Sequence, residues 1–403
     1  MTATSTDLHR LGEGAAGTAL VLVEQARRGI IRWDEAHRMI TTITAAPIDA
    51  STTGVGLFRG APAVGYLLHR AARPGYAAAL AALDDAIDTA TRTRLAAGQE
   101  RIRRGEPTTV GEYDLISGLT GLGVYHMVRH RDTRLLPDIL EYLVALTRPL
   151  RVEGRTLPGW WCGDGPAGVP SPDYPNGHAN FGMAHGITGP LALLSAAMIA
   201  GITVSGHHEA IERICTFLDG WRQQDTTATW WPEVVSLAEH EQGRPARTTP
   251  GRPSWCYGVA GVARAQQLAG RARGDASRQQ DACDALTTAL GDERQLEQIT
   301  EAGLCHGWAG LLHTARRVTA DTPKPQTWTS TLDLLASRID DHVAQRGMPR
   351  RTGLLDGRAG LDLLDRSDGQ ATTTAESWDA CLLLTFPAGA TAPNHTATRT
   401  TTA

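Results

Sequence analysis

The stretch Gly186-Ile-Thr-Gly-Pro-Leu-Ala-Leu-Leu-Ser-Ala-Ala-Met198 decides the fold, because it opens an apolar run of helical length with a Gly-x-x-Gly step. This step occurs seven times in the 403 residues, once with alanine in its second place. The steps are Gly14/Gly17, Gly60/Ala63, Gly118/Gly121, Gly186/Gly189, Gly258/Gly261, Gly307/Gly310 and Gly357/Gly360. A single such step is typical of a loop that ends at a helix, but seven in phase indicate a repeated unit.

Each unit has room for a second helix after the apolar one. The amphipathic stretches that fit this second helix are Tyr76–Leu95, Leu135–Leu146, His208–Arg222, Ala276–Leu290, Thr327–Val343 and Glu376–Thr385. Apolar helices that alternate with amphipathic ones predict an inner layer with neighbours on all sides and an outer layer with one face in water. The sequence therefore predicts an all-α fold. The irregular repeat length favours a closed ring of helix pairs over an open superhelix.

Two stretches interrupt the repeat, 151–180 and 226–254, and each is rich in Pro, Gly or Trp. Each is too short for a domain with its own core and long for a simple connection. We expect both to be insertions over the mouth of the ring, within a single domain that spans residues 1–386. Residues 387–403 contain too few apolar side chains to fold and are predicted to be a disordered tail.

The composition excludes several classes of protein. With 39 basic and 43 acidic residues the formal net charge is −4, so nucleic acid and anionic membranes are poor candidate partners. The chain contains no apolar stretch of about 20 residues, and its polar start lacks the apolar core of a signal peptide. Six cysteines are too few for a disulfide scaffold in a chain of this length. We expect a cytoplasmic protein without a membrane span.

Alignment of the seven units exposes two columns of residues. The residues directly before the first glycine are all polar, namely Glu13, Arg59, Ser117, His185, Tyr257, His306 and Asp356. The residues one position earlier are Gly12, Phe58, Ile116, Ala184, Cys256, Cys305 and Leu355, which are apolar apart from two thiols. In a closed ring both columns gather at one end of the axis, beside helix N-termini that favour anions and lower the pKa of thiols.

Three residues in these columns have the chemistry of zinc ligands. Cys256, Cys305 and His306 come from neighbouring units, and three protein ligands leave a fourth zinc position open, as in catalytic zinc sites. Cysteines about 50 residues apart are more often unrelated core thiols. A metal is favoured only because Cys256 and Cys305 occupy the same position in their repeat units. Cys162 is the rival fourth ligand, which would make the metal structural, but it lies outside the columns.

Four further residues are candidates for catalysis. His185 occupies the position that supplies His306 in another unit and is suited to proton transfer near neutral pH. Asp114 could orient that imidazole, although the simpler role for it is a helix cap. Arg252 could stabilise a developing oxyanion or could be solvated in its loop. Tyr257 offers a phenol beside the metal, or packs with its hydroxyl hydrogen-bonded.

The motifs Asn180-Phe-Gly-Met-Ala-His-Gly186, Trp255-Cys-Tyr-Gly258 and Cys305-His-Gly307 resemble those of the lanthionine synthetase C-like cyclases, and the resemblance extends from about residue 11 to 386. It implies an α/α toroid, or double barrel, of seven inner and seven outer helices. The resemblance implies one Zn²⁺ bound by Cys256, Cys305 and His306, and active-site roles for Asp114, His185, Arg252 and Tyr257. The sequence departs from the family pattern at Ala63, and Pro253-Ser254 beside Arg252 leaves the position of that arginine least secure.

The activity implied by the resemblance is that of a lanthionine synthetase in lanthipeptide antibiotic biosynthesis. Such a cyclase, a lyase-type enzyme that forms C–S bonds, adds a cysteine thiolate to dehydroalanine or dehydrobutyrine in a dehydrated precursor peptide with a leader and a core. We expect a separate dehydratase as a further partner.

Three other functions compete with that of a cyclase. A noncatalytic zinc toroid that binds a thiol-bearing peptide or small thiol would need the metal ligands but neither His185 nor Asp114. A zinc hydrolase would use a metal-bound water, for which a thiol-rich ligand set is less suited. A glycosidase would need two facing carboxylates, for which only Asp114, Glu13 and Asp356 are eligible.

Overall fold

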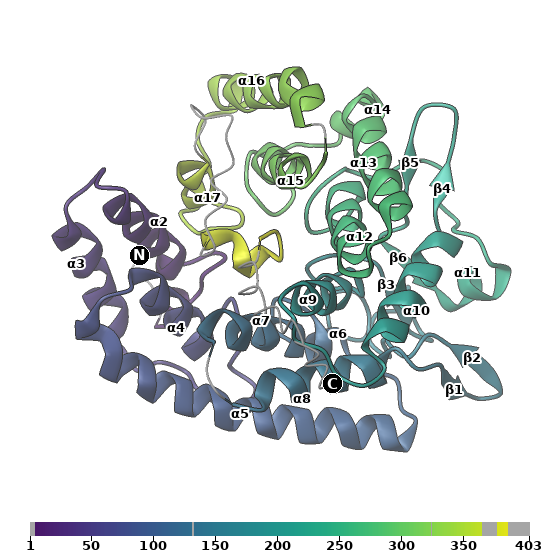
Figure 1. Ribbon diagram of the computed structural model, residues 1–403, viewed down its shortest axis with the longest axis horizontal. Coiled ribbons are helices and arrows are strands. Elements are labelled where there is room, and N and C mark those ends of the chain that lie inside the picture. Colours follow the sequence, from purple (N-terminus) through teal and green to yellow (C-terminus); the bar gives the residue numbers. More distant parts are fainter. Residues whose placement is uncertain (1–4, 131–132, 324, 365–376, 386–403) are drawn as a thin grey trace, which may run out of the picture.

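The helices form two concentric layers around a central axis in the computed structural model, which describes residues 5–130, 133–323, 325–364 and 377–385 (Figure 1). In these residues the inner helices are α2 (Ala15–Arg27), α4 (Gly60–Ala71), α7 (Leu119–Arg129), α9 (Thr188–Ile199), α12 (Val259–Arg273), α15 (Trp308–Ala320) and α17 (Arg358–Leu363). The outer helices in the same ranges are α3 (Trp33–Thr44), α5 (Ala77–Arg104), α8 (Leu135–Leu146), α10 (His207–Gly220), α13 (Ala276–Leu290) and α16 (Thr329–Arg346). The predicted all-α toroid is confirmed.

Shorter elements connect these helices. They are the helices α1 (Ser5–Leu8), α6 (Val110–Tyr113), α11 (Leu237–Gln242) and α14 (Glu293–Leu296), and the 3-10 helices Pro74–Tyr76, Pro325–Trp328 and Trp378–Leu382. The strands are β1 (Leu150–Val152), β2 (Arg155–Leu157), β3 (His178–Asn180), β4 (Gln223–Gln224), β5 (Thr229–Trp230) and β6 (Val234–Ser236). None of the helices in the described part of the chain is both long and apolar enough to cross a membrane.

The inner and outer helices differ in burial as the alternation in the sequence predicts. Every residue of α9 from Thr188 to Ala197 is buried. By contrast, α13 buries the face that carries Cys283, Leu286 and Leu290 and exposes the opposite face. An apolar helix is stable in water only where neighbours cover it on all sides, so the inner ring depends on the outer one.

The loops that precede the inner helices are joined by a closed cycle of backbone hydrogen bonds, which we call the belt. The belt consists of Leu11–Gly12, Phe58, Leu115–Ile116, Ala184, Cys256, Cys305 and Leu355. In turn, Leu11 N–H donates to the carbonyl of Phe58, Phe58 to Ile116, Leu115 to Ala184, Ala184 to Cys256, Cys256 to Cys305, Cys305 to Leu355, and Leu355 to Gly12. The N···O distances are between 2.8 and 3.5 Å. Because the seventh unit bonds to the first, the repeat forms a closed ring and not an open superhelix.

The second glycine of the repeated step allows this loop to approach its own helix. A Cβ atom at Gly121 would lie less than 3.0 Å from the carbonyl oxygen of Leu115, and one at Gly310 would clash in the same way with that of Leu304. In both units the carbonyl belongs to the residue six positions earlier. The glycine is therefore needed because the loop backbone packs directly on the first turn of the helix.

Much of the two insertions, which we expected over the mouth of the ring, lies at the edge of the molecule. Figure 1 shows β1, β2 and α11 there, whereas β5 lies beside α13. Asn180, at the end of the first insertion, reaches the mouth through its hydrogen bond to Tyr257. Antiparallel pairing of β3 with β6 joins the two insertions. Their aromatic residues explain the position: Trp160 and Phe181 contact Phe217 of α10, and the Trp231 indole donates to the carbonyl of Leu218. Burial of these rings against α10 holds this part of the insertions at the edge of the molecule.

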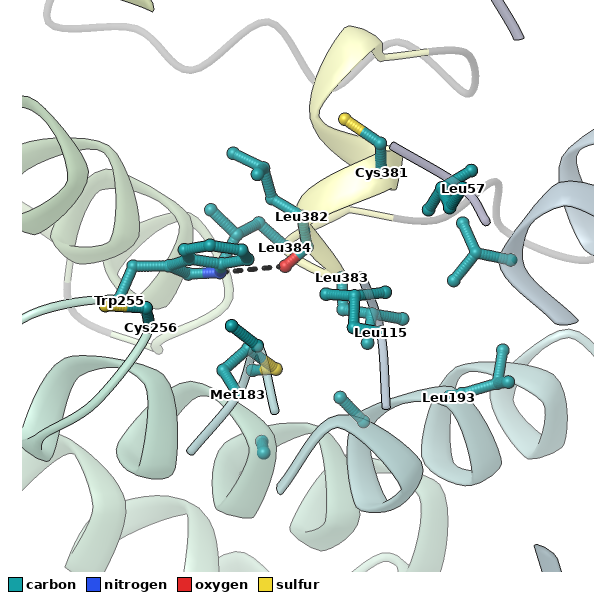
Figure 2. Packing of buried hydrophobic residues seen from close by; sticks show 14 of the residues in the cluster. Leu57, Leu115, Met183, Leu193, Trp255, Cys256, Cys381, Leu382, Leu383 and Leu384 are labelled. Carbon is teal, nitrogen blue, oxygen red and sulfur yellow. Dashed lines mark hydrogen bonds between the residues drawn. The ribbon is translucent and has the colours of Figure 1, made fainter. Parts of the chain in front are cut away.

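The C-terminal segment also differs from the prediction. Of the helix expected over Glu376–Thr385, the described part is a single 3-10 helix, Trp378–Leu382, which lies inside the ring (Figure 1). Figure 2 shows this segment among side chains of several units, with the Trp255 indole donating to the carbonyl of Leu382 at 3.0 Å. The segment is almost entirely buried, so it fills the interior where an outer helix was expected. The predicted domain boundary at residue 386 and the tail 387–403 lie outside the described residues.

An ion-pair cluster fixes this segment in the core. The carboxylate of Asp379 is fully buried and accepts hydrogen bonds from Arg317 Nε at 2.6 Å and Thr385 Oγ1 at 3.1 Å. It lies 2.8 Å from Nε2 of His313, whose ring stacks on Trp378. Burial alone would raise the pKa of Asp379, but the charge of Arg317 and the contact with His313 lower it far below the ordinary range.

We expect Asp379→Asn to lower the free energy of unfolding by about 3–5 kcal/mol at neutral pH, because it removes one partner of a buried ion pair. The folded-state pKa of Asp379 is depressed, so its contribution is complete above the unfolded pKa of about 4 and is lost as the pH falls below that value. Urea denaturation at several pH values measures both effects. Asp333→Asn, a change at an exposed acid of α16, is the control, and equal stability of the two variants would contradict the assignment.

Candidate active site

The two predicted cysteines and the predicted histidine come together at the mouth of the ring. The donor atoms of Cys256, Cys305 and His306 all lie within 4.8 Å of one another. The belt hydrogen bond from Cys256 N–H to the carbonyl of Cys305, at 3.1 Å, holds the two cysteines side by side. Cys256 is buried, whereas Cys305 and His306 are partly exposed. The cluster therefore has one side from which a substrate can reach it.

The chemistry of these side chains fits a zinc ion. Hydrogen bonds from the Cys305 thiol and the His306 imidazole hold the pKa of Cys256 well below its ordinary value, although burial opposes this shift. The pKa of Cys305 is raised in turn, because this thiol faces the Cys256 thiolate. The Ser254 hydroxyl lies 3.6 Å from the sulfur of Cys256. Two sulfur ligands that share a stabilised negative charge, with one imidazole, form a donor set that zinc prefers.

Cys162 is not part of this cluster. Its side chain is fully buried and lies 3.8 Å from the Tyr113 hydroxyl, and its backbone pairs with that of His178. Burial raises the pKa of Cys162 far above its ordinary value, so its thiol stays protonated. The rival interpretation, in which Cys162 completes a structural metal site, finds no support in this geometry.

His185 and Asp114 form a close pair on the neighbouring part of the mouth. His185 Nδ1 lies 2.6 Å from Asp114 Oδ2, and Asp114 Oδ1 accepts a hydrogen bond from the backbone N–H of Ser117 at 2.7 Å. Asp114 is buried, while more than a third of the imidazole is exposed. Burial of His185 disfavours its charged form, but the hydrogen bond and charge of Asp114 outweigh it, so the pKa of His185 is raised. The pair can hold and move a proton near neutral pH.

Tyr257 lies next to this pair. Its ring centroid is 6.3 Å from that of His185, and its hydroxyl oxygen accepts a hydrogen bond from Asn180 Nδ2 at 2.9 Å. Burial raises the pKa of Tyr257, so the phenol stays neutral. A neutral hydroxyl held by Asn180 can donate a hydrogen bond to a group bound beside His185.

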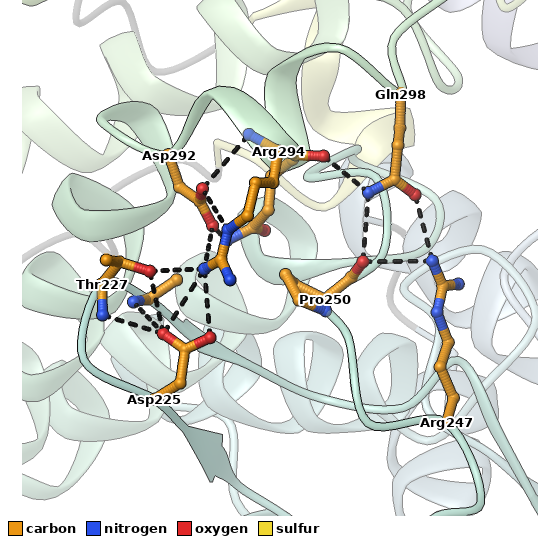
Figure 3. Close-up of polar contacts among 9 residues, drawn as sticks. Asp225, Thr227, Arg247, Pro250, Asp292, Arg294 and Gln298 are labelled. Atoms are coloured by element: carbon orange, nitrogen blue, oxygen red, sulfur yellow. Dashed lines mark hydrogen bonds and ion pairs between the residues drawn. The ribbon is translucent and has the colours of Figure 1, made fainter.

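A polar network orders the second insertion just before Arg252. Figure 3 shows that Gln298 donates to the carbonyl of Pro250, at 3.1 Å, and accepts a hydrogen bond from Arg247. In the same view Arg294 pairs with Asp225 and Asp292, which holds the insertion on α14. The positive charge of Arg252 acts to lower the pKa of Cys305, against the rise that the Cys256 thiolate causes. The side chain thus lies near the thiol cluster, as the sequence suggested.

Two carboxylates flank His306, and sequence reasoning named only one of them, Asp356, without a role at the metal. Glu301 Oε2 lies 2.9 Å from Nε2 of His306, and Asp356 Oδ1 lies 3.9 Å from Nδ1. Burial raises the pKa of Asp356. The polar column contains Asp356 but not Glu301, which stands six residues before Gly307, the position that Asn180 and Arg252 hold in their own units. Only folding of the loop before α15 brings Glu301 to the imidazole.

Comparisons with known proteins agree with the fold. The sequence profile of the lanthionine synthetase C-like protein family matches residues 7–383. The nisin biosynthesis protein NisC of Lactococcus lactis subsp. lactis is 24% identical over 288 residues, which span 69% of this chain and 66% of that relative. A solved structure of a nisin cyclase has the same fold, with a TM-score of 0.75 at 22% identity over 95% of this chain and 93% of the other.

Proposed function

Because this chain belongs to the lanthionine synthetase C-like family, we propose that it is a zinc-dependent cyclase that forms lanthionine and methyllanthionine rings. Its substrate is a ribosomally made precursor peptide in which serine or threonine has already been dehydrated. The peptide is closed by a bond between a cysteine sulfur and the β-carbon of dehydroalanine or dehydrobutyrine. Since the reaction consumes dehydrated residues, a dehydrating enzyme must act on the peptide first.

The observation that carries this proposal is the position of the thiol cluster beside the His185–Asp114 pair. The backbone N–H of Ala184, next to His185, donates to the carbonyl of Cys256 at 3.4 Å. A group that can hold a sulfur and a group that can move a proton therefore sit on adjacent loops of one end of the ring. A noncatalytic thiol-binding toroid would need only the first of them.

The reaction needs a substrate thiolate and a group that moves a proton, and the chain supplies residues for both. One Zn²⁺ bound by Cys256, Cys305 and His306 would keep the substrate cysteine in its thiolate form at neutral pH. The sulfur adds to the β-carbon, the electrons of the C=C bond move to form an enolate, and the α-carbon takes up a proton. The His185–Asp114 pair accepts the thiol proton or delivers the α-proton.

The remaining residues act on the peptide itself. Arg252 stabilises the enolate oxygen, with Tyr257 as a neutral hydrogen-bond donor beside it. Because both reacting groups belong to one peptide held at the mouth, ring closure also gains from their high effective concentration.

Mass spectrometry with thiol alkylation tests the proposal. A dehydrated precursor peptide with a known number of cysteines is incubated with the zinc-loaded protein, and each ring formed removes one alkylatable thiol without a change of peptide mass. We expect the number of free thiols to fall. A matched precursor that stays fully alkylatable would reject the cyclase and favour the noncatalytic zinc toroid.

We expect Glu301→Ala to weaken zinc binding about 10–100-fold, because a carboxylate that accepts from a metal-bound histidine fixes the orientation of its ring. The hydrogen bond of Glu301 to Nε2 leaves Nδ1 of His306 as the nitrogen for the metal. Competition with a chromophoric chelator measures the affinity. Glu297→Ala removes the same charge from an exposed site and should have no effect. An unchanged affinity in Glu301→Ala would contradict this role.

A further inference from the structure

Part of the ring mouth plays no role in the reaction described above. The metal ligands and His185 belong to the fourth, fifth and sixth units, whereas the seventh, first, second and third units face a cavity of about 120 Å³. The cavity is lined by Arg10, Gly12, Glu13, Phe58, Arg59, Ile116, Ser117 and Leu355. Apart from Arg10, these residues all come from the two columns that also supply Cys256, Cys305, His185 and His306.

The floor of this cavity is apolar. Phe58 and Leu355 are buried and Ile116 is partly buried. Gly12 packs directly against this floor, because a Cβ atom at this position would lie 3.1 Å from Cδ1 of Leu355 and 3.7 Å from Cδ1 of Phe58. Gly12 does not have a positive φ, so its backbone does not require glycine. A larger side chain at this position would displace Leu355 and change the shape of the cavity floor.

The rim of the cavity is polar. Arg10 forms an ion pair with Glu13 at 2.8 Å, and both side chains are substantially exposed. Nε of Arg59 is buried and has no hydrogen-bond acceptor within the described ranges. An apolar floor with a polar rim suits one apolar side chain whose peptide backbone stays at the rim.

Hydrogen bonds link the loops that line the cavity to the loops of the catalytic groups on both sides. On one side, Ser117 N–H donates to Asp114, the partner of His185. On the other side, the carbonyl of Leu355 accepts from the N–H of Cys305 at 3.0 Å. For a peptide with its cysteine at the metal and its dehydrated residue at His185, this cavity therefore lies on the neighbouring loops of the same mouth.

We infer that the cavity is a substrate subsite that takes one apolar side chain of the core peptide, from a residue near the reacting cysteine. This inference rests on the proposed function for the identity of the peptide. The subsite determines which sequences around the cysteine are held for ring closure, because burial of an apolar side chain against Phe58, Ile116 and Leu355 adds to the affinity.

Binding of peptides that cannot cyclise tests the subsite apart from the reaction. The probes are fluorescein-labelled heptapeptides with one central cysteine and otherwise glycine, and a series in which leucine replaces each glycine in turn. Fluorescence anisotropy with the zinc-loaded protein measures their dissociation constants. We expect leucine at one or more positions to tighten binding about 10-fold over the all-glycine probe. We expect Gly12→Val to remove this gain and to leave the all-glycine probe unaffected.

Two further variants complete the test. Gly75→Val places the same side chain at an exposed glycine with open space around it and should keep the leucine gain. Leu355→Ala enlarges the cavity and should shift the preference from leucine to phenylalanine, which gives an independent readout if Gly12→Val does not fold. The inference is overturned if no leucine probe gains affinity, or if the gain persists in Gly12→Val with normal zinc content. Because these probes lack dehydrated residues, a failure of cyclisation alone would affect only the proposed function.

Discussion

Replacement of Cys305 by alanine is expected to leave the protein without bound zinc and without thioether-forming activity. The change removes one of two sulfur donors from a cluster whose donor atoms lie within 4.8 Å of one another, and the two remaining ligands cannot retain zinc against buffer and peptide. The substrate thiol then stays protonated near neutral pH, since its ordinary pKa is about 8.5. Elemental analysis after gel filtration gives the zinc content, and thiol alkylation with mass spectrometry gives the number of rings.

Cys162→Ala is the matched control for this change. It removes a thiol of the same kind that is buried outside the cluster, and it should keep about one zinc per chain. The belt bonds of Cys305 involve only its backbone, so thermal unfolding should show that Cys305→Ala is folded. Complete ring formation by a zinc-free Cys305→Ala preparation would refute the proposed mechanism.

His185→Ala is expected to slow ring formation about 10²–10⁴-fold, the usual contribution of a positioned proton-transfer group, while zinc binding is kept. Separate measurement of kcat and KM distinguishes this role from peptide binding, because the loss should fall mainly on kcat. A loss confined to KM would assign His185 to substrate binding.

Asp114→Asn tests the pair through the acid–base behaviour of the imidazole. Asp114 raises the pKa of His185 against the effect of burial. Without this carboxylate burial prevails, so the pKa should fall and the imidazole should lose its proton at a lower pH. NMR titration of the His185 ring measures this shift, and any pH-dependent limb of the rate should move in the same direction. An unchanged titration would show that Asp114 does not act on His185.

The ring and its site could be predicted because they repeat. Every residue of the sequence column that contains Cys256 and Cys305 belongs to the belt, so residues aligned in the sequence are also neighbours in the structure. The pairing of Asp114 with His185 was less secure from sequence, because an aspartate near a helix start is commonly a cap. The distance of 2.6 Å settles that the two side chains meet.

Other features escaped prediction. Glu301 holds the repeat position of Asn180 and Arg252, six residues before the first glycine of its step, but that position carries no common chemistry that would have marked it as a partner of His306. The pattern around Asp379 predicts an outer helix, but its carboxylate pairs with Arg317 inside the ring. Aromatic side chains hold much of the insertions against α10. In the last two cases a contact distant in sequence outweighs the local pattern.

The belt has a consequence for how firmly the proposed zinc ligands are held. Loops are normally the parts of a protein that fluctuate most and exchange their amide hydrogens fastest. Here each loop is bonded to the next around a complete circle, so none can swing outward without breaking the bonds to both of its neighbours. The amides of Cys256, Cys305 and Leu355 should therefore exchange with deuterium as slowly as those of the inner helices. The separation of the two sulfurs is then set by the whole circumference and not by either loop alone.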